Sequence, residues 1–166
     1  RGRGPRARAA VLAGLACLAA ALGLRAAARV TVWSSGYALA ASGLATCPQS
    51  AHLHYGMGRQ YAARGEFDKA LAEYETALAI DPAYYEALSS AGLLFQRRGD
   101  FDEALRRYRR TLQIKVGLAE ALRNMGSVHL AKRDFPAAIR VLEAASAADP
   151  KDPEIQSDLA AAYAQM

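Results

Sequence analysis

The chain has 166 residues, which is the length of one ordinary domain. Its net charge of +5 comes from the N-terminal end, because residues 1–30 hold six arginines and no acidic residue. The rest holds 15 basic and 16 acidic residues, so the basic stripe typical of a nucleic-acid-binding domain is missing, and we exclude nucleic acid as a partner. The two cysteines, Cys17 and Cys47, lack the spacing of a redox or metal motif. Because Arg1 is not a methionine, we expect the chain to be part of a longer protein.

An uncharged segment of sixteen residues runs from Ala9 to Leu24, after a basic N-terminal flank at residues 1–8. As a helix it would span about 24 Å, and extension to Ala28 brings it near the roughly 30 Å of a bilayer core if Arg25 reaches the interface. We therefore predict a transmembrane helix over residues 9–28. A cleaved signal peptide, with a small-residue site at 26–28, and a buried alanine-rich helix remain alternatives.

The arginines orient this segment, since four precede it and two follow it. The positive-inside rule puts residues 1–8 in the cytoplasm. Everything after Leu24 is then expected in the lumen of the endoplasmic reticulum or, in a bacterium, outside the cytoplasm. The signal-peptide alternative leads to the same side.

A period of 34 residues governs the remainder of the chain. The positions that coincide in three copies carry small, aromatic or aliphatic side chains: Gly58, Gly92 and Gly126; Phe67, Phe101 and Phe135; Ala70, Ala104 and Ala138; Tyr61, Phe95 and His129; Tyr74, Tyr108 and Leu142; Leu71, Leu105 and Ile139. Pro82 and Pro150 close the first and third copies, and Val116 stands between them. Small residues let two helices approach closely, and the aromatic residues fill the space beside them.

These spaced positions resemble the tetratricopeptide (TPR) repeat family. The resemblance implies an all-α solenoid of antiparallel helix pairs, preceded by the predicted transmembrane helix. We divide the chain into a basic flank at 1–8, a membrane helix at 9–28, a linker or degenerate half repeat at 29–50, repeats at 51–84, 85–118 and 119–152, and a partial repeat or capping helix at 153–166. The expected helices cover about 51–64, 67–80, 84–98, 101–115, 118–132, 135–148 and 152–165. Pro48 lies one period before Pro82, so Ser34–Thr46 is expected to form the second helix of a degenerate repeat before the first.

The segment 29–55 carries a second pattern, with a basic residue before a tryptophan, then Leu…Ser-Gly-Leu, Cys-Pro and Ala…His-Tyr. The residues concerned are Arg29, Trp33, Leu39, Ser42, Gly43, Leu44, Cys47, Pro48, Ala51, His54 and Tyr55. This string resembles the join between the last membrane helix and the first repeat of the transmembrane and TPR repeat-containing O-mannosyltransferases. The resemblance implies that the parent uses dolichyl-phosphate mannose, with catalytic acids upstream of this chain, and that the repeats lie in the lumen and help to hold the polypeptide acceptor.

The binding surface of such an array is expected in the concave groove that the first helices line. By helical spacing, the exposed groove residues are His52, Tyr55, Arg59, Glu86, Ser89, Leu93, Gln96, Glu120, Arg123, Asn124 and Ser127. Their mixed charge favours an extended peptide held by hydrogen bonds. At the positions of the chaperone-binding TPR clamp only Asn124 is compatible, and the asparagine ladder of nuclear-type sugar transferases is absent.

The sequence predicts no catalytic, cofactor-binding or metal-binding residue. His52, His54 and His129 are interpreted as structural, and Asp100, Asp102 and Glu103 as acids that suit a helix start. The basic cluster around Tyr108 is expected on the outer, solvated face. We therefore expect a protein-binding module of a membrane O-mannosyltransferase-like protein. The alternatives are a membrane-anchored or exported TPR scaffold without enzymatic activity and, less favoured by the clamp positions, a cytosolic co-chaperone adaptor.

Overall fold

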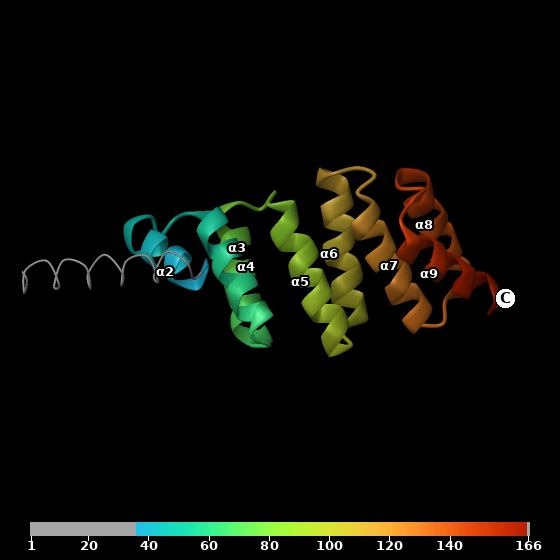
Figure 1. Ribbon diagram of the computed structural model, residues 1–166, viewed down its shortest axis with the longest axis horizontal. Coiled ribbons are helices and arrows are strands. Elements are labelled where there is room, and N and C mark those ends of the chain that lie inside the picture. The colour runs from blue at the N-terminus through green and yellow to red at the C-terminus, as the bar shows by residue number, and fades with distance from the viewer. Residues whose placement is uncertain (1–35, 166) are drawn as a thin grey trace, which may run out of the picture.

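The computed structural model describes residues 36–165, and this part of the chain folds into eight α-helices without a strand (Figure 1). The helices are α2 (Gly36–Thr46), α3 (Ala51–Ala63), α4 (Phe67–Ile80), α5 (Tyr85–Arg98), α6 (Phe101–Ile114), α7 (Ala119–Ala131), α8 (Phe135–Ala148) and α9 (Pro153–Tyr163). From α3 onward they lie within about two residues of the ranges that the period predicts. The basic flank and the predicted membrane helix over 9–28 lie outside the described residues. None of the helices within 36–165 has the length and hydropathy needed to cross a bilayer.

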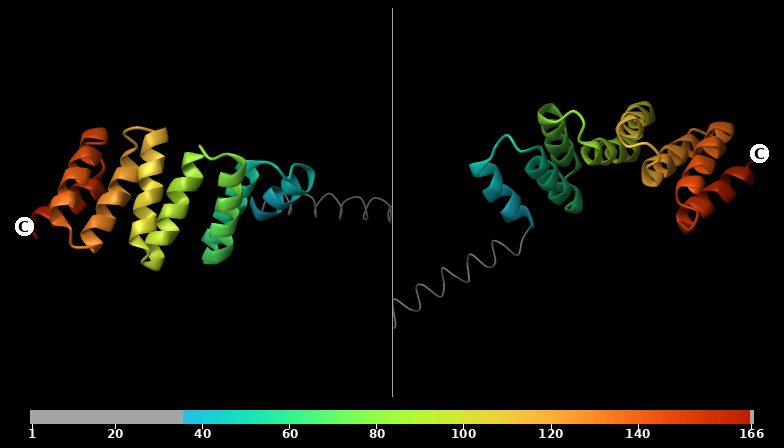
Figure 2. Two further views of the ribbon diagram at one scale, coloured as in Figure 1. Left: turned by 180° about the vertical axis from the view of Figure 1, so that it is seen from behind. Right: turned by 90° about the horizontal axis from the view of Figure 1, so that it is seen from above.

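The helices form antiparallel pairs, α3 with α4, α5 with α6 and α7 with α8, and each pair packs on the next. Helix α2 packs against α3 at one end, and α9 packs against α8 and α7 at the other. Seen from above, the pairs follow one another along the long axis rather than gathering round one centre (Figure 2). This is the arrangement of a solenoid, in which each repeat contacts only its neighbours.

The helix boundaries follow from local chemistry. Gly65 and Gly99 adopt the left-handed conformation, with φ of 77° and 87°, directly after the first helices of their pairs. In the third pair Arg133 holds a φ of 60° in the same connection, a conformation that is uncommon for a residue with a side chain. Asp134 then caps α8, because its side chain accepts a hydrogen bond from the backbone N–H of Ala137, and Pro136 lies in the first turn, where proline is tolerated.

The close approach within each pair depends on a glycine of the first helix. A Cβ added at Gly58 would lie 2.5 Å from the ring of Tyr74, and one at Gly92 would lie 2.8 Å from the ring of Tyr108. In the third pair the corresponding contact joins Gly126 and Leu142. Each of these large side chains therefore occupies the space that a side chain on the facing helix would need.

The buried interior consists mainly of alanine, aliphatic and tyrosine side chains arranged as three successive clusters along the axis. Ala70, Ala104 and Ala138, one in each second helix, are completely buried. Val116, which stands in the position of the closing proline, is among the exposed large hydrophobic residues. Short side chains at the helix contacts keep the pairs close together, as the period predicts.

Helix α2 lies where the sequence predicts a degenerate half repeat before the first full pair. Within the described residues α2 begins at Gly36, whereas the sequence predicts a start near Ser34. A Cβ added at Gly43 would lie 2.9 Å from the side chain of Leu53, so α2 and α3 also approach through a glycine. The chain therefore uses one packing device in the half repeat and in the full pairs.

Replacement of Gly58 by alanine should destabilise the protein by about 1–3 kcal/mol, because the new methyl group overlaps the Tyr74 ring and lies 3.1 Å from the backbone oxygen of Ala70. Gly56 on the same helix is the matched control, since an added Cβ there has no neighbour within 4 Å. Gly56→Ala should stabilise the helix by about 0.5–1 kcal/mol. Urea unfolding followed by circular dichroism measures both, and equal effects of the two changes would contradict the packing.

His129 occupies the slot that Tyr61 and Phe95 fill in the preceding repeats. Its Nδ1 is buried without a hydrogen bond and lies 3.4 Å from a carboxylate oxygen of Asp134. Burial lowers the pKa of His129 below its ordinary value of 6.5, and the Asp134 carboxylate opposes this shift. The fold therefore favours the neutral imidazole.

Stability should fall as the pH drops through about 6.5, because the unfolded chain then binds a proton that the folded chain resists. The variant His129→Phe, which restores the aromatic residue of the other repeats, should show a shallower decline. Urea unfolding between about pH 8 and about pH 5 compares the two proteins. Identical slopes would show that His129 contributes nothing to the pH dependence.

Candidate functional site

The inner surface of the array is formed by the first helix of each pair. Helix α5 contacts α7 and α7 contacts α9, although a second helix of a pair lies between them in the chain. These first helices are therefore closer together than a straight stack would place them. A continuous face that runs from α3 through α5 and α7 to α9 results, and it is the face on which the sequence predicts a groove.

All eleven residues predicted to line the groove lie on α3, α5 and α7. His52, Arg59, Leu93 and Glu120 are exposed, whereas Tyr55, Glu86, Gln96, Arg123 and Ser127 are half-buried and Ser89 and Asn124 are buried. The structure thus brings the predicted residues onto successive helices of one face. Their role in binding remains a prediction.

The end of this face at α3 is held by contacts among its own side chains. The Tyr55 ring lies 5.2 Å from the Tyr84 ring and 5.8 Å from the Tyr74 ring, measured between centroids. The Nδ1 of His52 and the hydroxyl of Tyr84 are 3.0 Å apart and share a hydrogen bond. The guanidinium of Arg59 lies 5.9 Å from the centroid of Tyr55. These contacts fix the orientation of Tyr55.

A chain of hydrogen bonds connects α6, α5 and α7 beneath the middle of the face. The hydroxyl of Tyr108 donates to Oε1 of Gln96 at 2.9 Å, and Nε2 of Gln96 donates to the hydroxyl of Ser127 at 3.2 Å. Burial raises the pKa of Tyr108 well above its ordinary value, and Glu120 adds to the rise. The phenol therefore remains a donor at neutral pH, and Gln96 is fixed between two partners.

Two buried polar side chains on the face have no such partners. Ser89 is 9% exposed and Asn124 is 8% exposed, and among the described residues nothing accepts from or donates to either side chain. Their polar atoms are not sealed off, because His129 Nδ1 is the one fully enclosed unpaired atom in residues 36–165. The side chains of Ser89 and Asn124 thus retain unused hydrogen-bonding capacity.

A cavity of about 200 Å³ opens on the face between α3, α5 and α7. It is lined by Tyr55, Tyr85, Glu86, Ser89, Ser90, Leu118 and Glu120. We call it the tyrosine–glutamate cavity. Of its lining, Tyr85, Ser90 and Leu118 are absent from the predicted groove, because helical spacing alone does not show which neighbours close a cavity between helices.

A second cavity on the same face lies between α7 and α9. Its lining consists of Arg123, Pro153, Glu154, Ser157 and Asp158. Arg123 donates a hydrogen bond to Glu154 and forms an ion pair with it. Burial raises the pKa of Asp158, and Glu154 adds to the rise while Arg123 opposes it. We call it the arginine–glutamate cavity; its α9 residues could have been predicted by extending the 34-residue period by one repeat.

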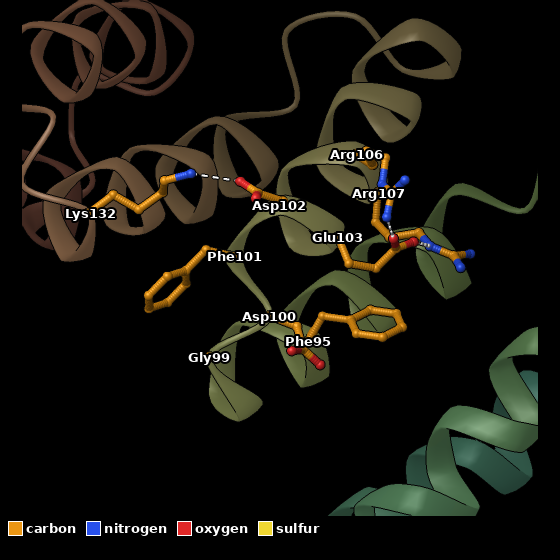
Figure 3. Close-up of a pocket in the computed structure, with 9 residues that line it drawn as sticks. All are labelled: Phe95, Gly99, Asp100, Phe101, Asp102, Glu103, Arg106, Arg107 and Lys132. Atoms are coloured by element: carbon orange, nitrogen blue, oxygen red, sulfur yellow. Dashed lines mark hydrogen bonds and ion pairs between the residues drawn. The ribbon is translucent and has the colours of Figure 1, made fainter.

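A larger cavity lies away from this face, where the end of α5, the start of α6 and the end of α7 meet (Figure 3). Its volume is about 680 Å³, but its charged side chains already pair with one another. Lys132 lies 2.6 Å from Asp102, and Arg106 and Arg107 both contact Glu103. Arg107 also reaches Glu75 of the neighbouring pair at 2.8 Å. These contacts connect successive pairs.

The basic cluster around Tyr108 is accordingly less charged than its sequence indicates. Arg106 and Arg107 pair with Glu103, and Arg107 pairs with Glu75 as well, while Arg110 donates to the side chain of Gln113 at 3.1 Å. His52 and His54 also have hydrogen-bond partners within the array. His54 contacts Glu73 at 2.7 Å and the carbonyl oxygen of Pro48 at 3.0 Å. Within residues 36–165 no group of three potential metal ligands comes together.

Comparison with known proteins identifies the repeats. A family model described as TPR repeat matches residues 58–99, and one described as Tetratricopeptide repeat matches residues 95–163. A comparison with curated proteins gives no match.

Solved structures with the same fold include the first TPR of Spaghetti (RPAP3) bound to the HSP90 peptide SRMEEVD. The TM-score is 0.67 at 18% identity, over 70% of this chain and 92% of that one. A structure of MamA aligns with a TM-score of 0.60 at 25% identity, over 62% of this chain and 60% of that one. A second structure of MamA protein aligns with the same TM-score at 24% identity, over 65% of this chain and 59% of that one.

Proposed function

This chain belongs to the tetratricopeptide repeat family over residues 58–163, and from that premise we propose that its concave face binds extended segments of partner polypeptides. TPR arrays are protein–protein interaction modules, and the Spaghetti domain of the same fold holds a peptide. The face that runs from α3 to α9 is the corresponding surface of this chain.

The observation that carries this proposal is the pair of buried, unpartnered polar side chains on the groove floor, Ser89 and Asn124. Their polar atoms are not sealed off and have no partner among the described residues, so they are available to bond a bound peptide. An asparagine amide offers both a donor and an acceptor, which match the C=O and N–H of an extended peptide backbone. Because backbone groups occur in every sequence, this contact favours an extended conformation over a particular side chain.

Replacement of Asn124 by alanine should weaken peptide binding by about threefold to tenfold, because two neutral hydrogen bonds are lost. The measurement is fluorescence anisotropy with the full chain, using peptides selected from an unbiased display library. Thr76→Ala is the control: Thr76 lies on α4, a second helix, is exposed, and bonds only to the carbonyl of Ala72. Equal affinities of the two variants for every selected peptide would contradict binding in the groove.

For the setting of the module we propose the lumenal C-terminal region of a membrane O-mannosyltransferase-like protein, in which the repeats hold the acceptor. The support is the residue pattern of 29–55, which includes Trp33, the Gly43-Leu44 and Cys47-Pro48 pairs and Tyr55. The position of α2 directly before the first repeat is compatible with this pattern. A membrane-anchored or exported scaffold without an enzyme is the alternative, and both share an extracytoplasmic array.

The topology of the chain tests this setting. A glycosylation acceptor inserted beside Gln49 should be modified in microsomes while the chain remains uncleaved, and an acceptor inserted in the flank 1–8 should remain unmodified. The readout is the shift in gel mobility before and after endoglycosidase treatment. Modification of the flank instead would place the repeats in the cytosol. Loss of residues 1–28 would show that this segment is a cleaved signal peptide and not a membrane helix.

A further inference from the structure

The tyrosine–glutamate cavity carries negative charge that no ion pair within residues 36–165 neutralises. Glu86 and Glu120 line it from the first turns of α5 and α7. Within residues 36–165 neither carboxylate takes part in an ion pair. Lys115, at 5.1 Å from the Tyr85 ring centroid, and Arg59, at 5.9 Å from that of Tyr55, contact the rings without lining the cavity.

Acids in the first turn of a helix are favoured by the helix dipole, so Glu86 and Glu120 alone would identify no site. The second observation is Ser89, which lines the same cavity, is 9% exposed and has no hydrogen-bond partner among the described residues. Its hydroxyl oxygen can accept a hydrogen bond from a cationic N–H group. The helix dipole does not explain why this buried hydroxyl is left open to the cavity.

The arginine–glutamate cavity supplies an internal precedent, because it is the same site two repeats further along the chain. At the period of 34 residues its Arg123, Pro153, Glu154, Ser157 and Asp158 correspond to Tyr55, Tyr85, Glu86, Ser89 and Ser90. There the chain fills the position of Tyr55 with an arginine whose guanidinium binds the glutamate that corresponds to Glu86. In the tyrosine–glutamate cavity a tyrosine stands in that position, so the glutamate lacks its cation.

We propose that the tyrosine–glutamate cavity binds the side chain of a lysine or arginine in the partner polypeptide, with Glu86 and Glu120 as counter-ions and the Ser89 hydroxyl as acceptor. This inference rests on the proposed function of the groove and specifies the chemistry of its partner.

The dimensions and the rings of the cavity suit such an occupant. Its volume of about 200 Å³ is below the roughly 300–1,000 Å³ of sites for free small molecules, and suits one side chain. The aliphatic stem of a lysine or arginine would lie against Tyr55 and Tyr85, because such stems pack on apolar surface while the charged head reaches its partners. Aromatic faces also attract cations directly, as the contact of Lys115 with Tyr85 illustrates.

The same charges disfavour an acidic partner. The peptide SRMEEVD held by the Spaghetti domain contains two glutamates and one aspartate. In this chain the groove charges from α5 to α9 that have no counter-ion are Glu86, Glu120 and Asp158, within the part that the structure describes. An acidic side chain bound over α5 to α9 would lie beside carboxylates of like charge, whereas the exposed groove cation Arg59 lies on α3.

Fluorescence anisotropy at low salt tests the proposal with a set of labelled peptides of one extended Ser/Gly/Val backbone that differ in the central residue: Arg, Lys, norleucine or Glu. The peptide SRMEEVD is added as an acidic probe. The Arg and Lys peptides should bind the full chain about tenfold more tightly than the norleucine peptide, and the Glu and SRMEEVD peptides should bind more weakly still. This advantage should diminish as salt is added.

The double variant Glu86→Gln/Glu120→Gln should remove the preference for the Arg and Lys peptides over the norleucine peptide. The matched control is Asp68→Asn/Asp102→Asn, which removes the same charge from two side chains that are 99% and 85% exposed and lie outside the groove. A second variant, Tyr55→Arg, copies the arrangement around Arg123 and should fill the cavity from within, so that the Arg and Lys peptides lose their advantage. Circular dichroism confirms that each variant remains helical.

The outcomes separate the two proposals. Equal binding of the four peptides, weakened in each case by Asn124→Ala, would support binding in the groove. It would overturn the proposal that the tyrosine–glutamate cavity binds a lysine or arginine side chain. A preference for Arg that survives in the double glutamine variant, or that the control abolishes equally, would also overturn it. Absence of binding by every peptide, including those selected from the display library, would overturn the proposed function and this inference together.

Discussion

The contact between a glycine of each first helix and a large side chain of the second helix sets the geometry on which the rest of the array depends. Gly58 and Gly92 have no Cβ, so the Tyr74 and Tyr108 rings lie directly against the backbone of the facing helix. The pairs formed in this way stack through fully buried alanines, which keep neighbouring helices close. Close stacking brings α5 against α7 and α7 against α9, and that contact creates the inner face.

Tyr108 connects this packing to the candidate site. Its ring fills the space beside Gly92, while its hydroxyl donates to Gln96, which in turn donates to Ser127 on the inner face. One side chain thus stabilises the helix pair and orients groove residues on two helices. Gln96 is therefore held between two hydrogen-bond partners, whereas the side chains of Ser89 and Asn124 have no partner among the described residues.

The fold follows from the sequence because its determinants recur at fixed spacing. Glycine, alanine and aromatic positions 34 residues apart predict each pair, and Pro48 predicts a helix where α2 lies. Spacing could not predict Arg133 in a left-handed conformation, since a glycine holds the corresponding turn in the preceding repeats. It also could not predict which groove charges pair. Arg123 and Glu154 meet because α7 and α9 are neighbours, whereas Glu86 remains unpaired because Tyr55 stands where an arginine would be needed.

The central claim is that partner polypeptides bind on the inner face, and site-specific photo-crosslinking tests it most directly. A benzoylphenylalanine placed at Leu93, an exposed groove residue on α5, should crosslink to a bound, selected peptide. The same group placed at Thr76, exposed on α4, should not. Crosslinking at Leu93 that unlabelled peptide suppresses is the predicted result. Equal crosslinking at both positions, or crosslinking at Thr76 alone, would contradict the assignment of the groove.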